Sequence, residues 1–168
     1  MILIPGFLFC RIWDIPIDFL RKNEIHGVIL DIDNTLTFDH APELPDRTAQ
    51  WLEKIEQAGI KAAIVSNNRE ARVKPFAERC GLSYVADALK PKRVGFERSC
   101  AVLGERAENI AVIGDQLFTD ILFGNRFGCT TILVEPMGPD LPWYVKAKRV
   151  LEKPFMPYIH RKKKYHAE

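Results

Sequence analysis

The chain has 168 residues, of which 47% are hydrophobic and 27% are charged, so it suits one globular domain with a sizeable core and leaves little room for a second. Its net charge of +2 excludes a whole-molecule attraction to nucleic acid or to anionic surfaces. The four cysteines form no C-x-x-C pair, which argues against a zinc knuckle or a disulfide framework and is typical of reduced thiols in the cytosol. We therefore predict a single cytoplasmic domain over residues 1–168.

The N-terminal segment, residues 1–25, is strongly apolar. Pro5, Arg11 and Asp14 interrupt it well before the roughly 20 consecutive apolar residues that a membrane span needs. A signal peptide is not expected, because no basic region precedes the apolar stretch and no small-residue cleavage site follows it. We predict that this segment packs against the domain, with contact to a membrane surface as the alternative.

From residue 26 onward, short apolar runs bounded by turn residues alternate with helical patterns. The expected strands are residues 26–31, 61–66, 84–86, 109–114 and 130–135. Because these runs are almost wholly apolar, they are typical of parallel strands that are buried on both faces.

Four helices are expected between these strands. The first begins at Asp46 as its N-cap, and the second ends at Gly81 and contains Pro75, which we expect to kink or restart it. Pro91 suits the first turn of the third helix, and the fourth covers about residues 119–127. This order predicts an α/β fold: a three-layer α/β/α sandwich whose parallel sheet is built by right-handed crossovers.

Polar side chains follow each of the first four strands. In open parallel sheets the functional crevice lies beyond the carboxyl ends of the strands, so these residues are the candidates for a site. They are Asp31 and Asp33, Ser66 and Asn67, Lys90, and Asp115 and Asp120.

Two of these carboxylates, Asp31 and Asp33, are separated by a single residue. Neighbouring anions repel each other unless a cation or a shared proton lies between them. Oxygen ligands match Mg²⁺ better than zinc. The candidate metal ligands are Asp31, Asp33, Asp115 and Asp120, together with a backbone carbonyl.

A carboxylate nucleophile can split the hydrolysis of a phosphoester into two steps through an acyl-phosphate. Asp31 is the candidate nucleophile, and Asp33 is the candidate acid and base that protonates the leaving alcohol and then deprotonates water. Ser66, Asn67 and Lys90 are the candidate phosphate-binding residues, because phosphoryl transfer depends on positioning and on neutralising the phosphoryl oxygens.

Each of these residues also has a purely structural explanation. Ser66 can be a turn hydroxyl, and Lys90 can be a solvated residue before a proline. Asp115 and Asp120 can form a turn and cap the following helix. Their joint order along the chain favours the catalytic explanation.

These motifs resemble those of the haloacid dehalogenase (HAD) superfamily of phosphatases. The resemblance rests on DIDNTL at residues 31–36, on Ser66 in IVSNN, on Lys90 and on GDQLFTD at residues 114–120. It implies a Rossmann-like sheet with Asp31 as nucleophile, Asp33 as acid and base, and Ser66 and Lys90 as phosphate clamps. It also implies that Asp115 is the second protein carboxylate on Mg²⁺ and that Asp120 supports the metal shell. The stretches NNREARVKPFAERCGL and GDQLFTDILFGNRFG are most similar to subfamily IIIA, the YqeG-type proteins, which are related to the mitochondrial phosphatidylglycerophosphate phosphatases.

The spacing of the motifs leaves no room for a cap domain, because the intervals from Asp33 to Ser66 and from Ser66 to Lys90 each hold little more than one helix. An uncovered crevice admits a phosphate on a large body, such as a protein, a nucleic-acid end or a lipid headgroup, although oligomerisation could supply a lid. Residues 36–45 are expected to form a substrate flap.

The C-terminal segment, residues 142–168, is predicted to be a basic amphipathic helix followed by a tail. Trp143, Ala147, Val150 and Leu151 lie on one side of the helix, and residues 161–164 are all basic. We expect these basic charges to lie away from the catalytic motifs. The segment could bind anionic lipid or RNA through its charges, or it could be a solvated tail.

The sequence therefore predicts a Mg²⁺-dependent phosphomonoesterase that acts through an aspartyl-phosphate on a bulky substrate such as phosphatidylglycerophosphate. A phosphatase for proteins or nucleic acids is one alternative, and an RNA-associated or assembly factor with an idle HAD core is another. We expect a cytoplasmic protein, with peripheral contact to an anionic membrane as the alternative, and the sequence specifies no oligomeric state.

Overall fold

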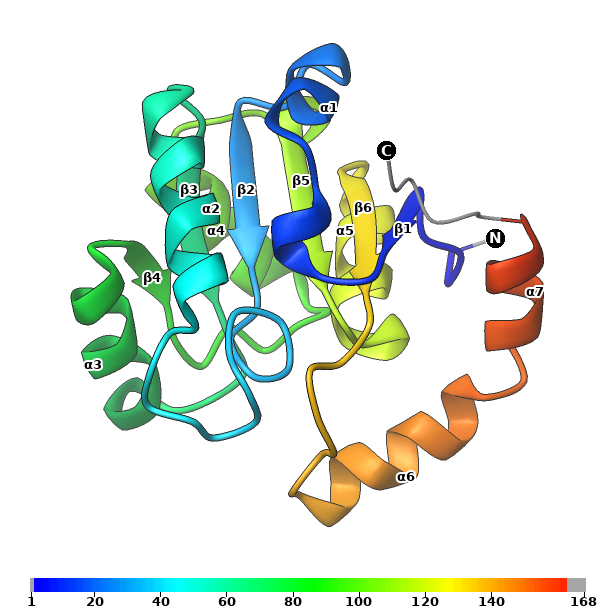
Figure 1. Cartoon of the computed structure of the whole chain (residues 1–168). Coiled ribbons are helices and arrows are strands. Elements are labelled where there is room, and N and C mark those ends of the chain that lie inside the picture. The colour runs from blue at the N-terminus through cyan, green and yellow to red at the C-terminus, as the bar shows by residue number, and fades with distance from the viewer. Residues whose placement is uncertain (1, 163–168) are drawn as a thin grey trace.

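The computed structural model describes residues 2–162, and within them six parallel strands form one sheet in the order β1-β6-β5-β2-β3-β4 (Figure 1). The strands are β1 (Phe7–Phe9), β2 (Gly27–Leu30), β3 (Lys61–Val65), β4 (Ser83–Val85), β5 (Ile110–Gly114) and β6 (Thr130–Val134). Strand β2 is central, with Leu30 in register with Ile64 of β3 and Ile113 of β5. Because every pairing is parallel, the carboxyl ends of all these strands lie at the same edge of the sheet.

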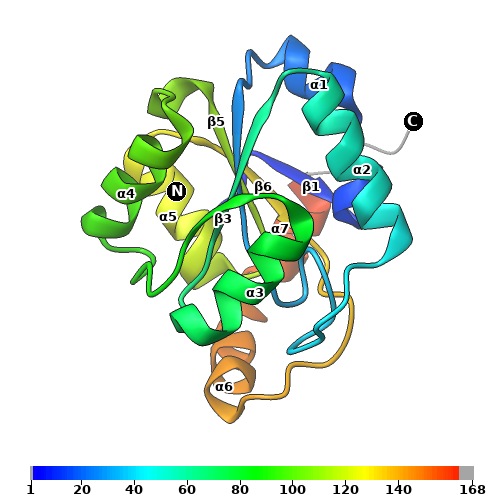
Figure 2. The same cartoon turned by 90° about the vertical axis from the view of Figure 1, so that its left-hand side faces the viewer.

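Helices cover both faces of the sheet. They are α1 (Ile17–Lys22), α2 (Asp46–Gln57), α3 (Glu70–Cys80), α4 (Arg93–Leu103), α5 (Leu122–Phe127), α6 (Trp143–Glu152) and α7 (Met156–Lys162), with the short helices η1 (Ile12–Asp14), η2 (Ala107–Asn109) and the π-helical η3 (Leu117–Ile121). Figure 2 shows α4 and α5 on one side of the sheet and α1 and α2 on the other. This arrangement confirms the predicted three-layer α/β/α fold, and none of the described residues forms a cap domain.

The residues of β2 explain why both faces are covered. Val28 and Leu30 pack into the same buried cluster as Trp51 of α2, whereas Ile29 packs on the opposite face with Phe123 of α5. Successive side chains of a strand point to opposite faces, so a strand without polar residues must be buried on both. The continuous apolar runs of the sequence are thus confirmed as interior strands.

The helix boundaries differ from the predicted ones in small ways. Helix α2 begins at Asp46, but its N-cap is Pro45. Helix α3 ends at Gly81, which is left-handed with a φ of 66° as expected, but it continues across Pro75 without the predicted restart. Proline removes one backbone donor, and the buried side chains of Val73 and Phe76 hold the helix against the core on both sides of that position. Pro91 precedes α4 and does not lie in its first turn.

The N-terminal segment packs against the domain, as predicted. It also contributes β1, which pairs with β6 through Phe7 and Ile132 and which the sequence analysis missed. Ile12 and Ile15 follow it and are fully buried. A strand of three residues is too short to give a periodic signal, so only its apolar character was visible in the sequence.

None of the helices among the described residues is long and apolar enough to span a bilayer. Helix α7 packs on β1 and β6 through Ile159. Helix α6 lies beyond the edge toward which the β2 and β6 arrows point in Figure 1. Of the basic run at residues 161–164, residues 163 and 164 lie outside the described part of the chain.

Candidate active site

Three carboxylates meet at the carboxyl edge of the sheet. Asp31 follows β2, Asp115 follows β5, and Asp120 belongs to η3. One oxygen of each lies within 4.8 Å of an oxygen of the other two, so the three side chains could hold a single cation. The parallel topology brings them together, because the ends of adjacent strands β2 and β5 are neighbours.

Lys90 is a cation that contacts two of these carboxylates. It lies in the loop between β4 and α4, and its Nζ atom is 2.9 Å from Oδ1 of Asp31 and 2.7 Å from Oδ1 of Asp120. Its side chain is only 2% exposed. A buried ammonium is stable only when it is paired with anions, so the surface explanation of Lys90 does not apply.

Burial shifts the titration of these groups. Loss of solvent raises the pKa of Asp31 to about 7; the Lys90 ammonium opposes this rise, and the carboxylate of Asp120 adds to it. Burial likewise raises the pKa of Asp115 to about 8, against the influence of Arg149. The pKa of Lys90 is raised, because its desolvation is outweighed by the two carboxylates. When all three carboxylates are ionised, they carry one more charge than Lys90 and Arg149 together, and a divalent cation would favour that ionised state.

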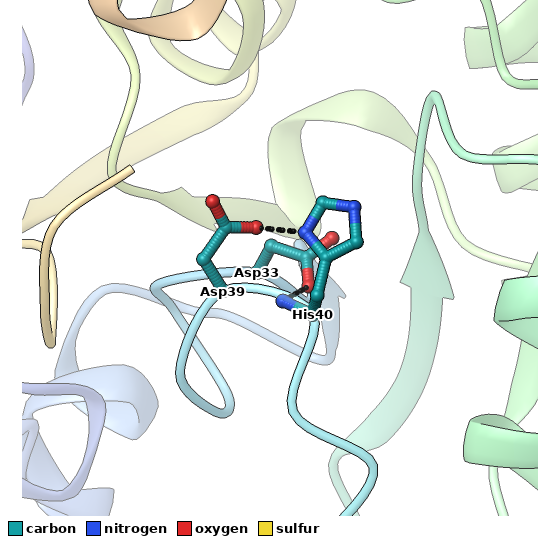
Figure 3. Close-up of side chains that lie close together, drawn as sticks. All are labelled: Asp33, Asp39 and His40. Atoms are coloured by element: carbon teal, nitrogen blue, oxygen red, sulfur yellow. Dashed lines mark hydrogen bonds and ion pairs between the residues drawn. The ribbon is translucent and has the colours of Figure 1, made fainter. Parts of the chain in front are cut away.

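The side chain of Asp33 does not join the three grouped carboxylates. Its carboxylate accepts hydrogen bonds from Arg72 Nη2 at 2.8 Å, from Asn68 Nδ2 at 2.5 Å and from the backbone N–H of His40 at 2.9 Å. Figure 3 shows it beside Asp39 and His40, whose side chains contact each other. Asp33 lines the same crevice as Asp31 but is not among the three grouped carboxylates, so its role as a metal ligand stays a prediction.

Ser66 and Asn67 follow β3 and also line the crevice. The Asn67 side chain accepts a hydrogen bond from the Lys90 backbone N–H at 2.6 Å and donates one to the Lys90 carbonyl at 3.1 Å. It thereby positions the loop that supplies the ammonium. The Ser66 hydroxyl oxygen accepts a hydrogen bond from the backbone N–H of Asn68 at 3.1 Å, as a turn hydroxyl does. Direct contact of either residue with phosphate stays a prediction.

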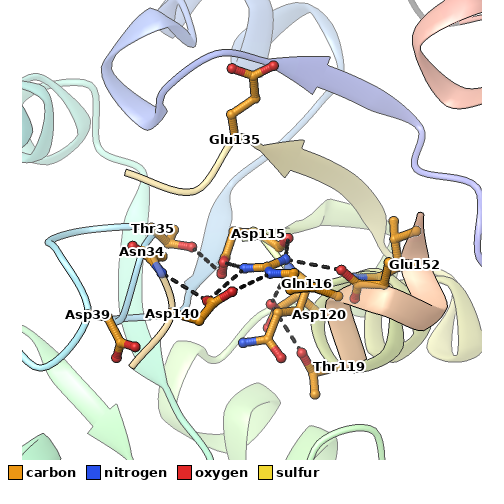
Figure 4. Close-up of polar contacts among 12 residues, drawn as sticks. Asn34, Thr35, Asp39, Asp115, Gln116, Thr119, Asp120, Glu135, Asp140 and Glu152 are labelled. Carbon is orange, nitrogen blue, oxygen red and sulfur yellow. Dashed lines mark hydrogen bonds and ion pairs between the residues drawn. The ribbon is translucent and has the colours of Figure 1, made fainter. Parts of the chain in front are cut away.

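The sequence analysis missed Arg149, which reaches the site from α6. Its guanidinium donates to the carboxylate and the carbonyl of Asp115, to Oδ2 of Asp140 at 3.0 Å and to Oε2 of Glu152 at 3.1 Å. Figure 4 shows Asp115, Asp140 and Glu152 gathered around these contacts. The expectation that the basic charges of the C-terminal segment lie away from the catalytic motifs is therefore wrong for Arg149 and for Lys148, which lines the crevice. Arg149 lies on the side of α6 opposite the apolar residues, and that position was the available signal.

Two side chains of the motif at residues 31–36 bind the motif at residues 114–120 and the loop that precedes α6. Thr35 donates to Oδ1 of Asp115 at 3.2 Å, and Asn34 donates to Oδ1 of Asp140 at 3.0 Å. Asn34 also accepts a hydrogen bond from the backbone N–H of Gly138 at 3.1 Å. The loop before α6 is thus tied to the Asp31 motif, which explains how α6 comes to lie at the crevice.

The crevice has a volume of about 180 Å³. Asp31, Asp33 and Lys90 line it from the sheet side, and Tyr144 and Lys148 line it from α6. Asp39 and His40, from the predicted flap at residues 36–45, also line the crevice, and the function of this segment as a flap stays a prediction. The arrangement places a buried carboxylate beside an ammonium in a crevice that no cap domain covers, and the role of Asp31 as nucleophile stays a prediction.

Comparisons with known proteins agree with this geometry. Residues 88–136 match the family described as HAD-hydrolase-like, and residues 1–78 match the mitochondrial PGP phosphatase family. The chain is 36% identical to the "Probable phosphatase YqeG" of Bacillus subtilis (strain 168), over 95% of this chain and 92% of that protein.

Two more distant comparisons concern a second group of phosphatases and the fold. The chain is 26% identical to "Phosphatidylglycerophosphate phosphatase 1, chloroplastic/mitochondrial" of Arabidopsis thaliana, over 80% of this chain and only 42% of that protein. The solved structure titled "Structure of putative HAD superfamily (subfamily III A) hydrolase from Legionella pneumophila" matches with a TM-score of 0.53 at 21% identity, over 76% of this chain and 72% of that chain, and this likeness shows the fold. The chain therefore belongs to the YqeG-type phosphatases of the haloacid dehalogenase superfamily and is a phosphoric monoester hydrolase.

Proposed function

We propose that the protein hydrolyses the phosphomonoester of a membrane lipid such as phosphatidylglycerophosphate, with Mg²⁺ and through an aspartyl-phosphate on Asp31. The observation that carries this proposal is the Asp31 carboxylate, which is buried beside Lys90 at the bottom of a crevice without a cap. A nucleophile in this position is accessible to a phosphate but shielded from bulk water.

The donor set suits Mg²⁺. Asp31, Asp115 and Asp120 offer only carboxylate oxygens, and hard cations of this kind prefer oxygen ligands. Asp31 and Asp115 would hold the ion, with Asp120 beside them. When bound, Mg²⁺ supplies positive charge that neutralises phosphoryl oxygens during transfer.

The residues of the chain supply the two chemical steps. In the first, an oxygen of Asp31 attacks phosphorus, the bond from phosphorus to the leaving alcohol breaks, and Asp33 donates a proton to the departing oxygen. In the second, water attacks the phosphorus of the aspartyl-phosphate, Asp33 takes the proton of that water, and inorganic phosphate leaves with Asp31 restored. Lys90 and Ser66 would bind phosphoryl oxygens in both steps.

Two features support a lipid substrate. No cap domain among the described residues covers the crevice, so the phosphate can belong to a body that stays outside it. The Arabidopsis relative is named as a phosphatidylglycerophosphate phosphatase, and the chain is similar to it along most of its own length.

A phosphate-release assay tests the proposal. Initial rates are compared on vesicles containing phosphatidylglycerophosphate, on a phosphopeptide and on a 5′-phosphorylated oligonucleotide, with Mg²⁺ and with a chelator. We expect Mg²⁺-dependent release that is fastest from the vesicles and that is abolished in Asp31→Asn. The control Asp18→Asn changes a carboxylate whose side chain is 80% exposed and should keep full activity. A higher rate on the peptide or the oligonucleotide, or retained activity in Asp31→Asn, would refute the lipid or the nucleophile assignment respectively.

A further inference from the structure

Helix α6 presents an apolar stripe to solvent. Trp143 is 78% exposed, Val150 59% and Leu151 62%, and Leu141 just before the helix is 60% exposed. Ala147 is also exposed. The predicted apolar side of this helix is thus turned away from the core, which is the reverse of the usual arrangement for a helix on a globular domain.

Basic residues border the stripe on both sides. With 100° between successive residues of an α-helix, Trp143, Ala147 and Val150 fall within one narrow sector, Leu151 extends it, and Lys146 and Lys148 lie just beyond its opposite edges. This distribution is typical of helices that lie in the interface of a membrane with their lysines toward anionic headgroups.

The inward side of α6 is fixed by polar contacts, so the outward side is fixed as well. Glu152 is buried and accepts hydrogen bonds from the backbone N–H groups of Leu117 and Phe118, at 2.7 and 3.4 Å. Arg149, on the same side, contacts Asp115 and Asp140. Rotation of α6 to bury its apolar stripe would break these contacts and leave buried charges without partners.

The stripe also borders the active-site crevice. Tyr144 and Lys148 line the crevice, and Leu151, which lies seven residues after Tyr144 and three after Lys148, is next to them on the surface of the helix. The Leu151 edge of the stripe therefore adjoins the side of α6 that lines the crevice.

We propose that α6 docks into the interface of an anionic lipid bilayer and holds the crevice at the level of the phosphate headgroups. The choice of a bilayer follows from the charge pattern: Lys146, Lys148 and Lys153 surround the stripe, and the sequence continues with four basic residues at 161–164. These charges complement anionic lipid, whereas they would repel the same helix of a second copy. The inference rests on the proposed function only in that a lipid substrate gives the docking its purpose.

Vesicle binding tests the proposal. The full chain is sedimented with vesicles of phosphatidylcholine alone and with anionic vesicles that contain about 30% phosphatidylglycerol. We expect binding to the anionic vesicles that weakens with added salt, and a loss of roughly tenfold or more in partition for the double variant Trp143→Ser, Leu151→Ser.

The control is the double variant Val94→Ser, Val102→Ser, which removes two exposed apolar side chains from α4 and should bind like the wild type. Thermal unfolding curves of both variants are compared with that of the wild type to establish that the variants are folded. Equal binding by the wild type and the α6 variant, equal binding to both vesicle types, or a dimer in solution that the α6 variant abolishes would each overturn the proposal.

Activity measurements separate this proposal from the proposed function. The α6 variant should hydrolyse a water-soluble monoester at the wild-type rate, because Trp143 and Leu151 do not line the crevice, and should lose activity on vesicles. If the protein binds vesicles but releases no phosphate from any substrate, the proposed function fails and the docking stands. If vesicle hydrolysis is unchanged in the α6 variant, the docking fails and the proposed function stands.

Discussion

Replacement of Lys90 by methionine should destabilise the metal-free protein strongly. Methionine keeps most of the apolar stem, so the change removes mainly the ammonium that lies 2.9 Å from Asp31 and 2.7 Å from Asp120. Three buried carboxylates would then have Arg149 as their contacting cation. Removal of one partner from a buried ion pair costs about 3–5 kcal/mol, because the remaining charge is left unpaired.

The loss should depend on pH with a definite sign. Without Lys90 the pKa values of the carboxylates rise further above their ordinary range, so protonation relieves the repulsion as the pH falls. The difference in unfolding free energy between the wild type and Lys90→Met should therefore be largest near pH 8 and smaller near pH 5, on either side of the pKa of about 7 that Asp31 has in the intact site.

Urea unfolding in the presence of a chelator measures this difference. The matched control is Lys61→Met, which removes an ammonium 2.8 Å from Oε1 of Glu105; the Lys61 side chain is 53% exposed. An exposed pair of this kind contributes less than about 1 kcal/mol. The reasoning is refuted if Lys90→Met costs no more than the control, or if its cost is the same at both pH values.

Further predictions concern the cations of the site and the loop that carries Lys90. Arg149→Met should lower the dissociation constant for Mg²⁺ about tenfold in calorimetric titrations. The variant loses a charge-assisted hydrogen bond to Asp115, worth about 1.5–3 kcal/mol, that competes with the ion for this carboxylate. Unchanged or weaker binding of Mg²⁺ would contradict this reasoning. Because burial raises the pKa of Asp31 to about 7 and that of Asp115 to about 8, the folded metal-free protein binds more protons than the unfolded chain, and its stability should fall as the pH rises through this range. Mg²⁺ displaces these protons, so the increase in melting temperature on adding Mg²⁺ should grow from about pH 6 to about pH 8.5, and a constant increase would contradict the shifted values. Gly95→Ala should cost about 1–3 kcal/mol in urea unfolding, since the new Cβ would lie 2.0 Å from the backbone oxygen of Ala88, and a neutral result would show that the loop before Lys90 yields freely.

The sheet and the positions of the motif residues could be predicted because both depend on local signals and one topological rule. Val28, Ile29 and Leu30 have no polar neighbour within their strand, so the sequence alone required burial on both faces. Parallel strands end at one edge, so the polar residues that follow them meet there. The proximity of Asp31 and Asp115 needed no further information.

The contacts that the sequence could not predict depend on how distant segments pack. Arg149 reaches Asp115 because α6 folds back over the edge of the sheet, and its pattern of charges alone is equally compatible with a solvated helix. The Asn67 side chain was expected at a phosphate, but in the structure it holds the backbone of Lys90, and this contact depends on the course of the loop after β4. Strand β1 forms only because β6 offers an edge for Phe7–Phe9.

Chemical trapping would identify the nucleophile without relying on a loss of activity. The protein is mixed with substrate and Mg²⁺, quenched in acid and treated with borohydride, which reduces an acyl-phosphate to an alcohol, and its peptides are then sequenced by mass spectrometry. We predict the reduced side chain at residue 31 in the wild type and its absence from Asp31→Asn. A reduced side chain at residue 33 instead, or efficient turnover with no trapped carboxylate, would contradict the role of Asp31.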